Sequence, residues 1–367
     1  MSINGVSPSV YLSDMSDRDQ IWDYHRASAL YVQFMYSQAS EFESYASRMH
    51  QCAGMLQFGF RSDRDPDQSP IVLKRAIFCR VRYCPICQWR RSMLWRAKFF
   101  QNLSVLEDGG YSKAPWIFLT LTVKNCEVKD LKSTLKHMNA SWRRLVKKVA
   151  FLNATLGYIR TTEVTLPANS KMAHPHFHCM IMVKPSYFKN HYISQKNWSL
   201  LWQDALEVDY DVVVDVKRIK GGLKQGVLET LKYSVKPADM LKNVDWFLEL
   251  TRQTHKMRFV ATGGCLKDVF KDDFSESNQD LISLDDDKNQ EDDGRRISFG
   301  FNRDHLRYVY LPKRTIGLDD LIPPSAIVKS HAKRIKNVQN HPYFIDDFGL
   351  LRQRKFFDVI DDFGNVL

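Results

Sequence analysis

The sequence has no apolar run close to the ~18 residues that a membrane-spanning helix needs. Its first residues, from Met1 to Asn4, lack the basic-then-apolar layout of a signal peptide, so we do not expect export. The cysteines number seven, an odd count, and are unevenly spaced. The chain is also long enough to build a hydrophobic core without disulfide cross-links, which argues against a disulfide scaffold. The sequence shows no internal repeat, which argues against a solenoid or a propeller.

What the sequence does contain is apolar residues and positive charge. Hydrophobic residues make up 44% of the chain and aromatic residues 12%, too many for wholesale disorder. Lys and Arg together number 53 against 42 Asp and Glu, which gives a net charge of +11 at neutral pH. A basic, aromatic-rich chain favours a polyanionic partner, most often nucleic acid.

The charge is unevenly distributed and suggests how the chain is organised. Residues 71–100 contain eight Lys or Arg and no acid, whereas residues 268–293 are rich in Asp and Glu among polar residues. We expect a helical N-terminal segment (1–51), a basic Cys-rich region (52–100), a main domain (101–267), a flexible acidic linker (268–296) and a partly ordered C-terminal tail (297–367).

The periodicity of the main domain alternates between strand and helix. Strands are predicted at 116–123, 158–166, 176–183 and 211–219, and helices at 129–152, 197–207 and 223–235. The order βαββαβα is typical of an α+β fold, in which helices pack mainly on one face of an antiparallel sheet.

Four cysteines in the basic region have spacings typical of a structural metal site. Cys84 and Cys87 form a Cys-x2-Cys pair that a tight turn can direct at one tetrahedral Zn²⁺ ion, and Cys79 precedes them closely. Cys52 completes a four-sulfur set, with His50 as an alternative fourth ligand. A buried reduced pair is the competing interpretation; a redox motif would need a βαβ context that these flanks do not provide.

The stretch His174-Pro-His176-Phe-His178 is the most informative in the sequence. On a strand, His176 and His178 point to one face and Phe177 points to the other, toward the core. Two imidazoles on one face form half of a divalent-metal site. Glu163, on the preceding strand, is the candidate carboxylate ligand, and His174 is an outer residue.

A third motif places Glu229 and Tyr233 four residues apart, on one face of a predicted helix. A tyrosine hydroxyl can attack a phosphodiester, a nearby divalent ion would stabilise the developing charge, and a glutamate can act as general base for a second nucleophile. An ordinary amphipathic helix with an exposed Glu–Lys pair would have the same pattern.

Basic residues flank these motifs and are candidates for binding phosphates. They are Arg80, Arg82, Arg90 and Arg91 around the cysteines, and Lys232 and Lys236 beside the tyrosine. The alternative is that they form ordinary solvated surfaces.

Taken together, these motifs resemble the rolling-circle plasmid replication initiators of the His-hydrophobe-His (HUH) endonuclease superfamily. The most similar group is the single-tyrosine bacterial initiators that carry a glutamate one turn before the tyrosine. The matching segments are residues 118–122, Glu163 with residues 176–178, Glu229 with Tyr233 and Lys236, and the cysteine cluster upstream. The resemblance covers most of the roughly 265 residues that precede the acidic linker and does not extend beyond about residue 270.

The resemblance implies an RNA-recognition-like sheet, the HUH palm, with a central site where His176, His178 and Glu163 bind Mg²⁺ or Mn²⁺. Tyr233 would nick one origin strand, leaving a 5′-phosphotyrosyl link and a 3′-hydroxyl primer. Glu229 would then direct water in the second cleavage that ends replication. The implied partners are double- and single-stranded origin DNA, a host helicase and a host DNA polymerase, in the bacterial cytoplasm and away from membranes.

Two other functions are compatible with the same residues. A relaxase or a single-strand transposase of this superfamily would share the nicking chemistry but cut at a different site. A non-catalytic zinc-containing DNA-binding regulator would use the histidines structurally, and Tyr233→Phe would then leave every DNA-dependent phenotype unchanged.

Overall fold

The computed structural model describes residues 10–61, 71–106, 110–168, 170–219, 226–227, 230–231, 235, 237–267, 281–282, 292–312, 343–345 and 351–353. The chain divides into two compact units, Met1–Leu94 with Glu276–Leu367, and Trp95–Ser275. No helix in this described part of the chain is long and apolar enough to cross a membrane.

The first unit is built on a four-stranded antiparallel sheet with the order β10-β9-β1-β2. Its strands are β1 (Met55–Arg61), β2 (Ile71–Ala76), β9 (Asp292–Asn302) and β10 (Arg307–Leu311). The central pairing joins β1 to β9, with Phe58 opposite Ile297, so residues more than two hundred positions apart form one core. β9 begins inside the range expected for the acidic linker.

Helices of the N-terminal segment belong to the same unit. They are α1 (Leu12–Met15), α2 (Ile21–Tyr36) and α3 (Glu43–His50), which confirms the helical periodicity of this segment. The longer helix α4 (Pro85–Leu106) begins at the cysteine cluster, with Pro85 at a position where proline has no backbone donor to lose. A separate pair of strands, β11 (Tyr343–Ile345) and β12 (Leu351–Gln353), lies in the tail.

Asp23 on α2 is a buried carboxyl whose protonation affects the stability of this unit. Its Oδ1 accepts a hydrogen bond from the backbone N–H of Tyr308 at 2.7 Å, and burial raises its pKa from 3.8 to about 7. The folded chain therefore holds a proton on Asp23 between about pH 4 and 7 that the unfolded chain has released. The free energy of unfolding consequently falls as the pH rises through this window.

We expect Asp23→Asn to stabilise the protein, because asparagine keeps the acceptor oxygen and removes the charge. The advantage over the parent grows by about 2–3 kcal/mol between pH 5 and pH 8, measured by chemical unfolding followed by tryptophan fluorescence. Asp17→Asn, at an exposed aspartate that precedes α2, is the control substitution. An advantage of Asp23→Asn that is the same at both pH values would contradict the raised pKa.

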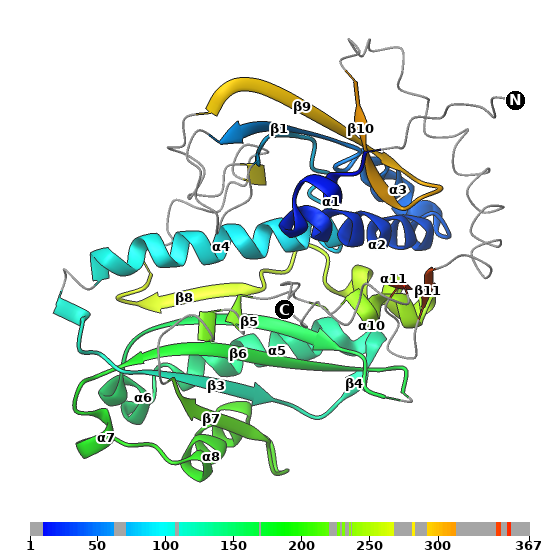
Figure 1. Cartoon of the computed structure of the whole chain (residues 1–367). Coiled ribbons are helices and arrows are strands. Elements are labelled where there is room, and N and C mark those ends of the chain that lie inside the picture. Colours follow the sequence, from blue (N-terminus) through cyan, green and yellow to red (C-terminus); the bar gives the residue numbers. More distant parts are fainter. Residues whose placement is uncertain are drawn as a thin grey trace, which may run out of the picture. The chain divides into compact units, whose positions relative to one another are not determined.

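The second unit contains the sheet that the sequence predicts for the main domain. The strand order is β7-β3-β6-β5-β8, with all neighbours antiparallel (Figure 1). The strands are β3 (Trp116–Thr122), β5 (Thr155–Thr165), β6 (Met172–Val183), β7 (Val214–Arg218) and β8 (Val260–Gly264), and the short β4 (Cys126–Glu127) pairs with β6. Four of these strands (β3, β5, β6 and β7) confirm the prediction, and β4 and β8 are additions to it.

Helices α5 (Leu131–Leu145), α6 (Val149–Ala154) and α8 (Gln195–Leu206) cover one face of this sheet. Trp142 of α5 and Trp202 of α8 both contact the ring of Phe177, which points to this face from β6. The single helix predicted for 129–152 is thus two helices, α5 and α6. The remaining helices are α7 (Tyr187–Asn190), α10 (Pro237–Lys242) and α11 (Val244–Gln253). The α+β fold class is confirmed.

Candidate metal centres and catalytic face

The opposite face of the sheet carries the predicted metal ligands. Register places Glu163 of β5 directly beside His176 of β6, and places Thr161 beside His178. Because side chains alternate along a strand, all four lie on the face turned away from α5 and α8. The strand pattern of the sequence therefore predicted this arrangement correctly.

Glu163, His176 and His178 converge tightly enough to hold one ion. Glu163 Oε2 lies 2.7 Å from His178 Nε2 and 3.1 Å from His176 Nε2, and the two Nε2 atoms are 3.0 Å apart. All three residues are buried, with at most 8% exposure. An octahedral ion with ligands at about 2.1 Å has adjacent ligand atoms about 3 Å apart, which these distances match.

Hydrogen bonds at the outer nitrogens hold the two rings in the orientation that a metal requires. His176 Nδ1 lies 3.2 Å from the backbone oxygen of His174, and since a carbonyl only accepts, Nδ1 carries the proton. Its Nε2 therefore presents a lone pair toward Glu163. His178 Nδ1 lies 3.3 Å from Thr120 Oγ1, an outer partner of the kind that fixes metal-binding histidines.

The two ring nitrogens and the carboxylate oxygen are arranged as ligands of a divalent cation. Two ring nitrogens that face each other and a carboxylate at about 3 Å repel one another unless a proton or a cation lies between them. One carboxylate and two imidazoles are acceptable to Mn²⁺ and Mg²⁺, and also to other first-row divalent ions. The geometry is compatible with metal binding and leaves the identity of the metal open.

Three residues that the sequence analysis did not select complete this face. Thr120 orients His178, Phe118 stacks on the His178 ring at 5.5 Å between centroids, and the Thr161 hydroxyl donates to the backbone oxygen of Thr230 at 2.7 Å. Alternating threonines inside an otherwise apolar strand, as in residues 118–122, are the signal that could have identified Thr120.

The Glu–Tyr segment lies mostly outside the described residues, including Glu229, Lys232, Tyr233 and Lys236. Its described neighbours are well placed on the metal-binding face. Thr230 accepts the hydrogen bond from Thr161, two residues along β5 from Glu163. Val227 and Leu231 pack in a buried cluster with Ile159, Met180 and Met182 of the same sheet face.

The four predicted cysteines meet in the first unit. Cys52 follows α3, Cys79 follows β2, and Cys84 and Cys87 lie at the start of α4. The sulfur atoms of Cys52 and Cys87, of Cys79 and Cys87, and of Cys84 and Cys52 are each 3.6 Å apart. Tetrahedral zinc with Zn–S bonds of about 2.3 Å separates its sulfurs by about 3.8 Å, so the cluster fits such an ion.

His50, the alternative fourth ligand, does not belong to the group formed by the four cysteines. Its Nδ1 lies close to Arg303 Nη2 and to the Gln33 side chain. All four cysteines are buried, and burial raises the pKa of the Cys52 thiol well above its ordinary value.

The four arginines near this cluster differ in their surroundings. Arg80 is exposed, and Arg82 and Arg91 are partly exposed. Arg90 is buried: its guanidinium lies 5.2 Å from the Trp22 ring centre and donates to the backbone oxygens of Leu281 and Ile282. This placement corrects the expectation that Arg90 contacts DNA, because its donors are used inside the unit.

With this geometry in hand, comparison with known proteins places the chain in a class. Residues 70–309 match the replication protein family. A replication protein of Streptococcus pneumoniae serotype 2, "Protein rep", is 31% identical over 303 residues, covering 79% of this chain and 92% of that protein. A "Protein rep" of Bacillus amyloliquefaciens is 33% identical over 251 residues, covering 62% and 72% respectively. No solved structure matches.

The chain therefore belongs to the replication protein family, and its resemblance to rolling-circle plasmid replication initiators is confirmed. The family match includes three of the four clustered cysteines (Cys79, Cys84 and Cys87), the Glu–His–His face and the Glu–Tyr segment in one stretch. A role in initiating plasmid replication follows from this membership.

Proposed function

We propose that this initiator is a metal-dependent endonuclease that nicks one strand of a plasmid origin through Tyr233. The observation that carries the proposal is the convergence of Glu163, His176 and His178 on a sheet face where Thr161 also holds the backbone of Thr230. This hydrogen bond holds the backbone at Thr230, three residues before Tyr233 in the sequence, against the metal-binding face.

Each residue has a distinct role in the proposed reaction. A bound Mg²⁺ or Mn²⁺ would polarise the scissile phosphate and offset its developing negative charge. The Tyr233 oxygen attacks phosphorus, forming a 5′-phosphotyrosyl bond as the P–O3′ bond breaks, and the departing oxygen takes up a proton to become the 3′-hydroxyl primer. Glu229 accepts a proton from the water that attacks in the terminating cleavage.

Other parts of the chain would hold the DNA and the fold. Lys232, Lys236, Arg80, Arg82 and Arg91 are proposed phosphate contacts, and the four cysteines are proposed ligands of a structural Zn²⁺. After initiation on a plasmid in the bacterial cytoplasm, a host helicase would separate the strands and a host DNA polymerase would extend the 3′ end. The proposed domain boundaries are those expected from the sequence, with the endonuclease at 101–267.

The proposal is tested by incubating the protein with supercoiled origin plasmid in Mn²⁺ or in EDTA. We expect nicking with Mn²⁺, none with EDTA, and at least about a hundredfold slower nicking for His178→Ala, because a metal ligand is lost. His255→Ala, at an exposed histidine in the same unit, is the control. Nicking that persists in EDTA would refute metal dependence, and a nick mapped to a transfer origin or transposon end would favour a relaxase or transposase.

A further inference from the structure

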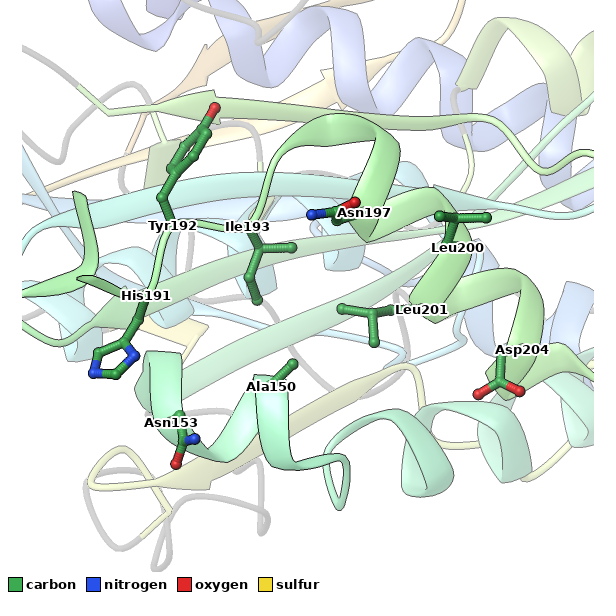
Figure 2. Close-up of a pocket in the computed structure, with 9 residues that line it drawn as sticks. All are labelled: Ala150, Asn153, His191, Tyr192, Ile193, Asn197, Leu200, Leu201 and Asp204. Atoms are coloured by element: carbon green, nitrogen blue, oxygen red, sulfur yellow. The ribbon is translucent and has the colours of Figure 1, made fainter. Parts of the chain in front are cut away.

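A groove of about 480 Å³ lies on the second unit between α6 and α8, away from the metal-binding residues. It is lined by Ala150, Asn153, His191, Tyr192, Ile193, Asn197, Leu200, Leu201 and Asp204 (Figure 2). Ile193 and Leu201 are directed toward Ala150, with His191 at one end and Asp204 at the other. Its size lies in the range of sites that bind small organic groups, about 300–1,000 Å³.

The loop that forms one wall of the groove is held rigidly by Tyr187. The hydroxyl of Tyr187 donates to the backbone oxygen of Ile193 at 3.2 Å and accepts from the Ile193 N–H at 3.3 Å. Trp198 Nε1 also donates to the Tyr187 hydroxyl oxygen. Tyr192, between these anchors, is 59% exposed, and its ring is supported by the rings of Tyr187 and Phe188. A supported but exposed aromatic ring is a preformed stacking platform.

Two lysines lie close in the sequence to residues that line the groove. Lys189 and Lys196 are both exposed on the α7–α8 segment. The one acidic residue that lines the groove, Asp204, forms an ion pair with Lys148. Lys189 and Lys196 are each within two residues in the sequence of a lining residue, His191 and Asn197 respectively, and the one acid in the lining is ion-paired.

A line of contacts joins this groove to the metal-binding face by way of the edge strand β7. Arg218 of β7 lies over the Phe188 ring at 4.5 Å, and its neighbour Lys217 points to the opposite face of the sheet. Lys217 is paired in register with Phe118, whose ring stacks on His178. Phe188, Arg218, Lys217 and Phe118 thus link the two faces through β7, where Lys217 also forms an ion pair with Asp215 at 2.7 Å.

We propose that this groove is a second binding site for single-stranded DNA, in which a base stacks on Tyr192 and phosphates pair with Lys189 and Lys196. The inference rests on the proposed function, since a nicked origin exposes such a strand. Stacking on an exposed ring and contact with the carboxamides of Asn153 and Asn197 both require an unpaired base. The basic rim complements the phosphates that accompany it.

The test is fluorescence anisotropy with a labelled oligothymidylate of about 20 nucleotides, in buffer without added Mg²⁺ or Mn²⁺ and without chelator, so that no cleavage is involved and the zinc proposed for the cysteine cluster is kept. We expect Tyr192→Ala to weaken binding by about 5- to 100-fold, the range for losing one stacked base, and Tyr192→Phe to restore it. We expect Lys189→Gln with Lys196→Gln to reduce the slope of log Kobs against log salt by about 1.4.

Matched controls come from exposed residues that are not among those lining the groove. Tyr310→Ala on β10 replaces another exposed tyrosine, and Lys132→Gln with Lys136→Gln replaces two exposed lysines near the start of α5. Unchanged affinity in Tyr192→Ala would overturn the groove whatever the outcome for nicking. If Tyr192→Ala weakens oligothymidylate binding but the parent protein does not nick origin DNA, the endonuclease proposal is refuted and the proposal of a DNA-binding groove is retained.

One other occupant is distinguishable by the same variants. The exposed side chains of Val149, Leu152 and Leu200 border the groove and would suit a second copy of the chain. If Leu200→Glu and Tyr192→Ala dissociate a dimer in sedimentation velocity while oligothymidylate affinity is unchanged, the groove is an interface between copies and the DNA proposal is wrong.

Discussion

Replacing Tyr233 by phenylalanine is expected to abolish both origin nicking and the covalent DNA–protein adduct. The substitution removes one oxygen and keeps the aromatic ring, so the proposed nucleophile is lost with the smallest possible change of side chain. Loss of a nucleophile in other enzymes costs about 10⁶ in turnover, so we expect a fall of at least about a thousandfold. The adduct is detected by its retarded mobility with labelled single-stranded origin oligonucleotide in Mn²⁺.

Two comparisons make this result specific to Tyr233. Tyr210→Phe removes the hydroxyl of a tyrosine in the same unit, one that lies 3.5 Å from the backbone nitrogen of Lys124, and should nick normally. Binding of the oligonucleotide without added Mg²⁺ or Mn²⁺ should be the same in Tyr233→Phe and the parent, because the hydroxyl acts in the chemical step. An adduct formed by Tyr233→Phe would mean that another residue is the nucleophile.

Much of the metal-binding face was predictable because strand geometry imposes a simple rule. His176 and His178 alternate with an apolar residue, so their common face follows from the sequence once the segment is taken as a strand. Glu163 was identifiable because a carboxylate among β-branched residues is unusual inside a strand. The register that places Glu163 beside His176 depends on the connection between the two strands, and only the structure supplies it.

The first unit was much less predictable, for a physical reason. Its sheet pairs β1 with β9, which are separated by the whole second unit in the sequence, and local periodicity carries no information about such a partner.

Two further features were not predictable from local patterns. The sequence of β8 in the second unit, Val260–Gly264, contains two glycines and lacks the alternation of a typical strand. Arg90 was placed on the surface because arginines usually are, whereas its neighbours Trp22 and Trp89 form a ring-lined site inside the unit.

The two candidate metal sites differ in what they should do for the chain. The Glu–His–His set lies on one sheet whose strands are already hydrogen bonded, so losing its metal should affect reaction more than folding. The cysteine set joins segments that follow α3 and β2 to the start of α4, where no single sheet or helix connects them. An ion at this point would contribute directly to the stability of the first unit.

Replacing Cys84 by serine is therefore expected to remove bound zinc and unfold the first unit. Cys84 is fully buried and its sulfur lies 3.6 Å from that of Cys52, so serine would leave an incomplete, weakly binding set of ligands. Structural zinc contributes about 10–16 kcal/mol of binding free energy in small zinc-dependent domains, far more than the marginal stability of most folds. We expect about one equivalent of zinc per chain in the parent and none in the variant, measured by elemental analysis of protein purified without chelator.

The control for this change is Cys126→Ser, which alters a partly exposed cysteine on β4 in the other unit. It should retain zinc and the near-ultraviolet signal of the buried Trp22 and Trp89 rings, which lie 4.7 Å apart in the first unit. Cys84→Ser should lose that signal, and a strong chelator added to the parent should reproduce the loss. If the parent contains no zinc, or if Cys84→Ser keeps both metal and signal, the four cysteines are a buried reduced cluster packed as small apolar residues.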